Sequence, residues 1–260
     1  MPKFSANLSM LFHEVDFMDR FSAAAASGFQ AVECQFPYGH DAALLAEQLH
    51  SHKLTMVLHN LPPGDWDAGE RGIACHPDRR AEFRAGVQLA IDYATALGCK
   101  QLNCLAGITP KGVTQETANA TLLDNLRYAA HALQQVDIRL LIEPINNYDI
   151  PGFHLNTTQQ AMELIRASDC TNLFLQYDVY HAQRTEGELA TTIAVCLPHI
   201  AHIQVADNPG RHEPGSGEIN YPWLFRHIDR LGYDGWIGCE YRPATTTQAG
   251  LAWLHAARAA

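Results

Sequence analysis

An alternation of short apolar runs with helical patterns constrains the fold of this chain more than any other feature of its sequence. Eight apolar runs predict strands, at residues 4–10, 31–37, 54–60, 101–107, 140–146, 173–180, 199–208 and 236–241. Stretches whose apolar residues recur at helical spacing predict helices, at 17–28, 41–52, 77–98, 114–135, 157–168, 187–197, 220–232 and 245–260. The chain is therefore expected to consist of eight strand-then-helix units.

This order of elements predicts an α/β fold, a single (β/α)8 TIM barrel domain covering residues 1–260. Eight strand–helix units in 260 residues match the usual size of such a barrel. A doubly wound sheet is the alternative, but the first predicted strand is not followed by the glycine-rich phosphate-binding motif of that fold. The chain contains no low-complexity segment that would separate two domains.

Charge and cysteine content limit the partners and the compartment. The net charge is −10, which argues against nucleic acid or an anionic membrane as a partner. The seven cysteines include no CxxC pair, so we expect mostly buried, reduced thiols and no zinc site. Polar residues interrupt the first twelve residues, "MPKFSANLSMLF", and no apolar stretch is long enough to span a membrane. We expect a cytoplasmic protein.

Polar side chains stand where several of the predicted strands end. In a barrel of this kind, catalytic groups project from the carboxyl ends of the strands. The polar residues at or just beyond these ends are His59 and Asn60 on strand three, Glu143 on five, Asp178 and His181 on six, Gln204 and Asp207 on seven and Glu240 on eight. A single buried carboxylate could be structural, but carboxylates at equivalent ends of three strands predict a site at the barrel mouth.

Three neighbouring carboxylates predict a bound cation. They cannot all stay ionised unless a positive charge lies among them. Oxygen ligands from glutamate, aspartate and glutamine suit a hard divalent ion, Mg²⁺ or Mn²⁺, which could polarise a carbonyl or hydroxyl group of a substrate. The alternative is a metal-free site in which one carboxyl group is kept neutral by its neighbours. We expect no organic cofactor.

The motifs that carry these residues closely resemble the hydroxypyruvate isomerase family, part of the larger xylose-isomerase-like group of TIM barrels. The motifs are "LIEPIN" with "DIPGF", "QYDVYH", "HIQVADNPGRHEPGSGEINYPWLF" and "GCEYRP", and the resemblance begins at "FSANLSMLF". It implies that Glu143 and Glu240 form the proton-transfer pair. It also implies a divalent metal site formed by Glu143, Asp178, Gln204 and Glu240. Related sugar epimerases have histidine where this chain has Gln204, whose neutral amide is a weaker ligand.

The resemblance also implies a reaction and further contacts. The reaction interconverts hydroxypyruvate and tartronate semialdehyde (2-hydroxy-3-oxopropanoate) through an enediolate, and either glutamate could take the first proton. In the epimerases a histidine at the offset of His181 contacts a substrate oxygen, and His59 could do the same. Arg71 and Arg211 are the best placed cations for the substrate carboxylate. Arg71 lies in the irregular segment 60–78, which either covers the substrate or is an ordered surface loop.

Several other functions fit parts of the pattern. A 2-oxo-tetronate isomerase would use the same chemistry and largely the same motifs, although segment 60–75 looks more like the hydroxypyruvate branch. A sugar or inositol epimerase or dehydratase is disfavoured by Gln204, and an apurinic-site endonuclease by the negative charge and the carboxylate-rich site. A non-catalytic binding protein gives no reason for three converging carboxylates. We expect a small 2-oxo or hydroxy acid as partner, and a homo-oligomer is compatible with the sequence.

Overall fold

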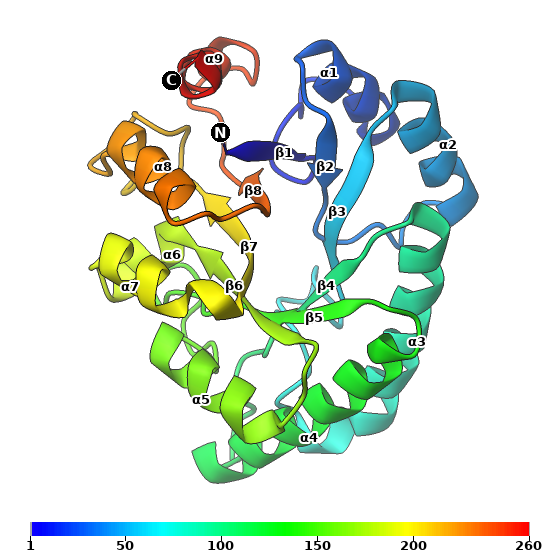
Figure 1. Ribbon diagram of the computed structural model, residues 1–260. Coiled ribbons are helices and arrows are strands. Elements are labelled where there is room, and N and C mark those ends of the chain that lie inside the picture. Colours follow the sequence, from blue (N-terminus) through cyan, green and yellow to red (C-terminus); the bar gives the residue numbers. More distant parts are fainter. Residues whose placement is uncertain (1, 260) are drawn as a thin grey trace.

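The apolar runs form eight parallel strands that close into one barrel in the computed structural model, which describes residues 2–259 (Figure 1). The strands are β1 (Lys3–Asn7), β2 (Ala31–Glu33), β3 (Thr55–Asn60), β4 (Gln101–Cys104), β5 (Arg139–Ile142), β6 (Leu173–Asp178), β7 (Ile200–Val205) and β8 (Trp236–Cys239). Each pairs with the next in sequence, and β8 pairs with β1 from Lys3↔Trp236 to Ala6↔Cys239. The predicted single-domain (β/α)8 barrel is confirmed.

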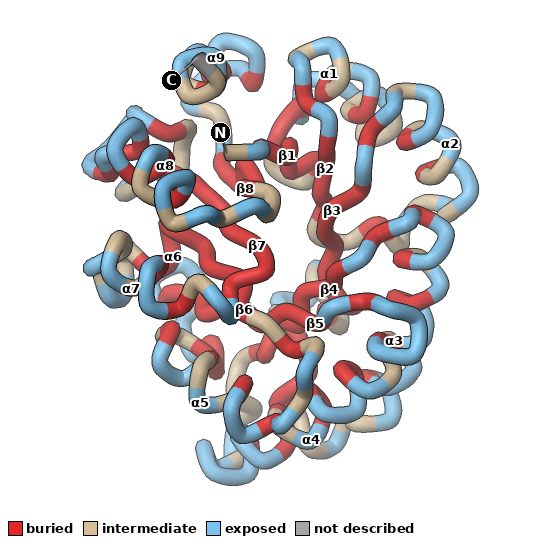
Figure 2. Tube along the Cα trace, in the orientation of Figure 1, coloured by how far each residue is buried: buried red, intermediate tan, exposed pale blue. Residues whose placement is uncertain are grey.

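Helices surround the barrel and bury one face each against the strands (Figures 1 and 2). They are α1 (Arg20–Ala26), α2 (Ala42–His52), α3 (Arg80–Leu97), α4 (Gln115–Gln134), α5 (Thr158–Ser168), α6 (Val179–Thr185), α7 (Leu189–Cys196), α8 (Tyr221–Arg230) and α9 (Ala252–Ala259). In α3 the buried positions Phe83, Val87, Ala90 and Ala94 recur every three or four residues, as an amphipathic helix requires. Within the described part of the chain, no helix is long and apolar enough to cross a membrane.

One helix, α6, was not predicted from the sequence. The predicted strand 173–180 ends at Asp178, and α6 starts at the next residue. The Asp178 carboxylate caps this helix, because its Oδ1 accepts hydrogen bonds from the backbone N–H groups of Tyr180 (2.7 Å) and His181 (3.1 Å). This cap places His181 in the first turn of α6, beside the end of β6.

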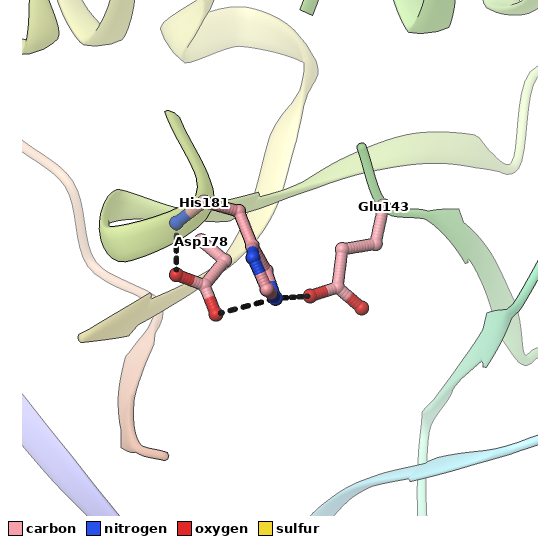
Figure 3. A group of neighbouring side chains, drawn as sticks. All are labelled: Glu143, Asp178 and His181. Atoms are coloured by element: carbon pink, nitrogen blue, oxygen red, sulfur yellow. Dashed lines mark hydrogen bonds and ion pairs between the residues drawn. The ribbon is translucent and has the colours of Figure 1, made fainter. Parts of the chain in front are cut away.

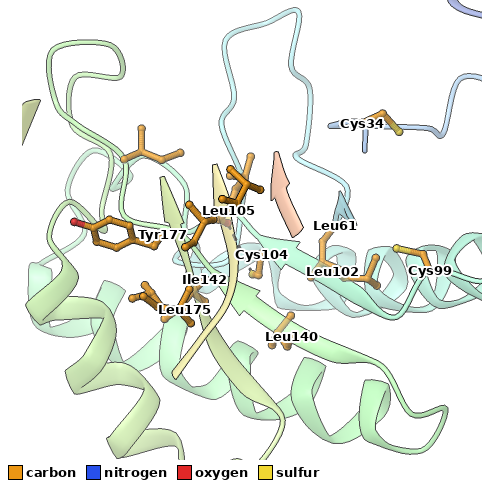
Figure 4. Close-up of a cluster of buried hydrophobic side chains, with 14 of the residues drawn as sticks. Cys34, Leu61, Cys99, Leu102, Cys104, Leu105, Leu140, Ile142, Leu175 and Tyr177 are labelled. Carbon is orange, nitrogen blue, oxygen red and sulfur yellow. Dashed lines mark hydrogen bonds between the residues drawn. The ribbon is translucent and has the colours of Figure 1, made fainter. Parts of the chain in front are cut away.

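The core has an outer and an inner part. Alternate strand residues point to opposite faces, so Leu140 and Ile142 of β5 join the large cluster between strands and helices, part of which is shown in Figure 4. Leu141 points the other way and packs in a small cluster with Ala31, Val57, Leu58 and Ala201. All seven cysteines are free thiols and all but Cys170 are buried, which confirms that part of the prediction.

A buried carboxylate, Glu33 at the end of β2, organises the polar part of the interior. Its oxygens accept hydrogen bonds from Ser5 (2.9 Å), Asn7 (3.0 Å), His202 (2.8 Å) and Gln204 (2.9 Å). Burial alone would raise the pKa of Glu33, but the attraction of His202 and these hydrogen bonds outweigh it, so the pKa lies below its ordinary value. Glu33 is therefore held as an anion beneath the barrel mouth.

Candidate active site

The carboxyl ends of the strands surround a cavity of about 1010 Å³. Five residues that the sequence singled out line it, namely Arg71, Glu143, His181, Arg211 and Glu240. Asp178 and Gln204 lie at the strand ends next to it but are buried in the barrel wall and interior. Because the barrel is closed, residues from elements far apart in sequence meet around one space.

Glu143 is the first residue after β5, and it is nearly without hydrogen-bonded support. Its Oε2 accepts one hydrogen bond from the side-chain amide of Asn103 (2.9 Å), while Oε1 lies 4.0 Å from Nε2 of His181. Burial raises the pKa of Glu143 well above its ordinary value, and the carboxylates of Glu240 and Asp178 raise it further. A carboxyl group in this environment readily holds a proton.

Glu240, directly after β8, is held by more partners. Its Oε2 pairs with the guanidinium of Arg211 (2.9 Å), and its Oε1 accepts hydrogen bonds from the amides of Gln35 (3.0 Å) and Asn7 (3.3 Å). Burial raises the pKa of Glu240 above its ordinary value, although Arg211 opposes this shift. The two glutamates thus face the same cavity with different surroundings, one carboxylate paired with a cation and the other not.

Asp178 and His181 complete a group of possible metal ligands with Glu143 (Figure 3). One ligand atom from each lies within 4.8 Å of the other two. The Asp178 Oδ2 atom is buried, lies 3.8 Å from Nε2 of His181, and accepts no hydrogen bond from any described residue. A buried carboxylate oxygen left without a donor is costly unless a cation contacts it. The oxygens of Glu143 and Asp178 therefore suit a hard divalent cation.

Gln204 is engaged inside the barrel rather than turned toward these carboxylates. Its Nε2 donates to Glu33, and its Oε1 accepts a hydrogen bond of 2.6 Å from Nε2 of Gln176. Glu33 can only accept, so it fixes which end of the Gln204 amide faces it. Ligation of a metal through Oε1 would require Gln176 to give up its hydrogen bond, so Gln204 as a ligand stays a prediction that this arrangement does not support.

His59 does not reach the cavity. Its ring is fully buried, its Nδ1 contacts the Tyr38 hydroxyl (3.3 Å) and the carbonyl oxygen of Asn60 (3.2 Å), and Asn60 lines the cavity instead. Burial lowers the pKa of His59 to about 4, so the ring is neutral. The contact of His59 with substrate stays a prediction that this arrangement does not support, because strand alternation turns its ring into the barrel wall.

The two predicted arginines line the cavity with their charges partly offset. Arg211 pairs with Glu240, lies 3.7 Å from Asp149 and stacks over the ring of Tyr180. Arg71 lies 4.0 Å from the ring centroid of Trp66, and its Nη1 donates to two backbone carbonyls. Segment 60–78 thus contributes Trp66 and Arg71 to the cavity wall.

A third arginine of the cavity, Arg242, was missed by the sequence analysis. It lies two residues after Glu240 in "EYRP" and is exposed at the mouth. No carboxylate among residues 2–259 forms an ion pair with it, so its charge is available to an anionic ligand. Its position two residues after a strand-end glutamate was the signal that could have identified it.

Comparisons with known proteins agree with this architecture. Residues 21–257 match the model of the xylose isomerase-like TIM barrel family. The chain is 59% identical to hydroxypyruvate isomerase of Escherichia coli and 48% identical to 2-oxo-tetronate isomerase of Cupriavidus necator, each over 98% of both chains. A crystal structure named as AP endonuclease, family 2, from Brucella melitensis superposes with a TM-score of 0.96 at 44% identity, covering 98% of this chain and 99% of the other.

Proposed function

This chain belongs to the xylose isomerase-like TIM barrel family, within which its close relatives are isomerases, and we propose that it is a hydroxypyruvate isomerase. The observation that carries the proposal is the placement of Glu143 and Glu240 on one cavity, from strand ends that lie three strands apart in the barrel order. A reaction that removes a proton from one carbon and returns it to the next needs two such groups around one substrate.

The reaction conserves every atom of the substrate. A carboxylate takes a proton from carbon 3 of hydroxypyruvate, which leaves an enediolate spread over carbons 2 and 3. A carboxylic acid then gives a proton to carbon 2, and the hydroxyl proton passes from oxygen 3 to oxygen 2, giving 2-hydroxy-3-oxopropanoate. Glu143 and Glu240 supply the two carbon-proton steps, and either can act first. A positioned acid or base contributes about 10²–10⁴-fold to the rate.

The residues of the site also fit a role for a divalent metal, for which we propose Mg²⁺, or Mn²⁺ in its place. Glu143, Asp178 and Glu240 would hold it, as the orphaned oxygen of Asp178 suggests. When bound, such an ion stabilises negative charge on a substrate oxygen. The chain itself contributes donors at the cavity: Arg211 beside Glu240 and the imidazole of His181 beside Glu143.

The substrate class follows from the charges of the mouth. Arg71, Arg211 and Arg242 line the cavity, so a small carboxylate is favoured over a neutral sugar. Arg211 already pairs with Glu240, which leaves Arg242 as the cation best able to hold the substrate carboxylate. A cavity of about 1010 Å³ has room for more than a three-carbon acid, so 2-oxo-tetronate is the second candidate substrate.

Activity assays with both acids test the proposal. We expect turnover of hydroxypyruvate, its loss in the presence of a chelator and its recovery with Mg²⁺ or Mn²⁺. Glu143→Gln and Glu240→Gln should each lower kcat/KM by about 10²-fold or more. Glu47→Gln, on the exposed face of α2, is the matched control and should leave activity unchanged. Isomerisation that survives in both active-site variants would refute the mechanism. Exclusive turnover of the four-carbon acid would show that 2-oxo-tetronate, and not hydroxypyruvate, is the substrate.

A nuclease function is the alternative suggested by the name of one structural relative. The net charge of −10 and the carboxylate-rich cavity disfavour a polyanionic DNA substrate. Incubation of the protein and Mg²⁺ with DNA containing apurinic sites should give no cleavage above that of Glu143→Gln.

A further inference from the structure

Asn146, three residues after Glu143, is completely buried and has one orientation open to its side-chain amide. Its Oδ1 accepts hydrogen bonds from the backbone N–H groups of Tyr148 (3.0 Å) and Asp149 (2.9 Å). Rotating the amide by half a turn would point the Nδ2 donor at two N–H donors. The backbone that follows β5 therefore determines which atom of Asn146 faces each direction.

The other end of the amide faces the ring of His181. Asn146 Nδ2 lies 2.6 Å from His181 Nδ1 and can only donate, so this ring nitrogen must accept. An accepting Nδ1 carries no proton. The proton of the neutral imidazole is then on Nε2.

A second donor lies near the ring but at a longer distance. Arg211 Nη2 is 3.5 Å from His181 Nε2, and a guanidinium cannot accept a hydrogen bond. One neutral ring cannot accept at both nitrogens. The 2.6 Å contact with Asn146 decides between them, and the Nε2 proton has carboxylate oxygens of Asp178 and Glu143 within 4.0 Å on its other sides.

This arrangement bears on the group of Glu143, Asp178 and His181 shown in Figure 3. A metal ligand needs a lone pair on Nε2, which would move the proton to Nδ1. That proton would then point at the Asn146 donor 2.6 Å away, and two donors would face each other. His181 is thus arranged to donate into the cavity and not to bind the metal.

We propose that Asn146 is a positioning residue that holds His181 in the Nε2–H tautomer, so that the imidazole donates a hydrogen bond to the oxygen of the enediolate instead of serving as a metal ligand. The enediolate part of this statement rests on the proposed isomerase function, whereas the tautomer does not. A neutral imidazole that polarises a carbonyl is an effective electrophile in proton-transfer isomerisation.

The tautomer can be observed directly by long-range ¹H–¹⁵N NMR on protein labelled in its histidines. The His181 signals are identified by their loss in His181→Gln. In the metal-free wild type we expect a protonated Nε2 and an unprotonated Nδ1, and the same pattern after Mg²⁺ is added. A wild-type spectrum with a bare Nε2, or a shift of that nitrogen to a metal-bound state with Mg²⁺, would overturn the proposal.

Asn146→Asp tests the role of Asn146, because a carboxylate accepts and should draw the proton to Nδ1. We expect the tautomer to reverse and kcat to fall by about 10²-fold. Asn119→Asp is the matched control: Asn119 Oδ1 faces His154 Nε2 at 2.8 Å outside the cavity, so an aspartate keeps the same acceptor. Its histidine pattern and kcat should not change.

The outcomes separate the two proposals. If Asn146→Asp loses activity without a change of tautomer, or changes the tautomer without loss of activity, the positioning role is wrong. If the predicted tautomer is found but neither acid is turned over, the isomerase proposal fails and the histidine assignment stands.

Discussion

At the scale of single residues, two buried glutamates show how neighbours decide the state of a carboxyl group. Glu33 and Glu143 are both buried, but Glu33 accepts hydrogen bonds from four side chains and Glu143 from one. The pKa of Glu33 is lowered and that of Glu143 is raised. The sequence pointed to Glu143 because it ends an apolar strand. Glu33 could not be identified in this way, because the side chains that donate to it come from β1 and β7, far away in the chain.

The network around Glu33 leads to a prediction about stability and pH. Because the folded-state pKa of Glu33 lies below its ordinary value of 4.5, its contribution to stability is fully present above pH 4.5 and is lost as the pH falls from there through the folded-state pKa. We expect Glu33→Gln to lower the free energy of unfolding at pH 7 by about 3–5 kcal/mol. The difference from wild type should shrink only as the pH falls below 4.5, as measured by urea unfolding. The exposed variant Glu47→Gln should show neither effect, and a gap that widens in acid would contradict the assignment.

At the scale of elements, the sequence predicted which segments form strands and helices better than how the loops pack. The strand cores and most helices lie where the apolar spacing placed them, because burial of one face requires that spacing. Helix α6 was missed because its start depends on a cap by Asp178, a residue that we assigned to the site alone. The loop after β3 packs against the loop after β4 through close contacts between their backbones. Such contacts leave no apolar pattern in the sequence.

Two glycines join these loops. A Cβ on Gly72 would lie 2.4 Å from the carbonyl oxygen of Leu105, and one on Gly107 would lie 2.4 Å from that of Gly72. Gly72 also has φ +105°, a backbone conformation that side chains disfavour. The close contact between these two loops holds in place segment 60–78, which contributes Trp66 and Arg71 to the cavity wall.

We expect Gly72→Ala to destabilise the protein by about 1–3 kcal/mol more than Gly69→Ala. Gly69 lies in the same segment with φ +96°, but no atom lies within 4 Å of its added Cβ. Backbone strain is therefore similar in the two variants, and only Gly72→Ala adds a clash. The Tm and the KM for hydroxypyruvate, the proposed substrate, measure the effect. Equal losses in both variants would show that the contact with Leu105 is unimportant.

At the scale of the whole molecule, closure of the barrel creates the site. The pairing of β8 with β1 brings Asn7 to Glu240, 233 positions later in the sequence, and lets one amide contact both Glu240 and Glu33. The carboxylates could be located from their places at strand ends. Their partners could not, because side-chain amides such as Asn103 and Gln35 have no periodic signature and act only once the ring of strands is complete.

The buried carboxylates of Glu143 and Asp178, with one Asp178 oxygen that has no donor, predict that a divalent cation stabilises the native protein. Ligand present at about 100 times its Kd adds about 2.7 kcal/mol to the free energy of unfolding. We expect Mg²⁺ to raise the Tm of the chelator-treated protein by several degrees, which NaCl at equal ionic strength should not do. Asp178→Asn should abolish the rise while keeping the cap of α6, because its Oδ1 can still accept from Tyr180 and His181. A rise that persists in this variant would place the ion elsewhere.

The contact between Gly238 and Glu33 has a consequence for how this barrel can change over evolutionary time. A Cβ on Gly238 would lie 2.4 Å from both oxygens of Glu33, so the carboxylate occupies the space of a missing side chain. A larger residue at position 238 is tolerated only if a smaller residue first replaces Glu33. A smaller residue at position 33 would leave the side chains that donate to Glu33 without an acceptor. The two positions are therefore epistatic, because a single substitution at either one destabilises the protein. Relatives with another residue at one position should also differ at the other.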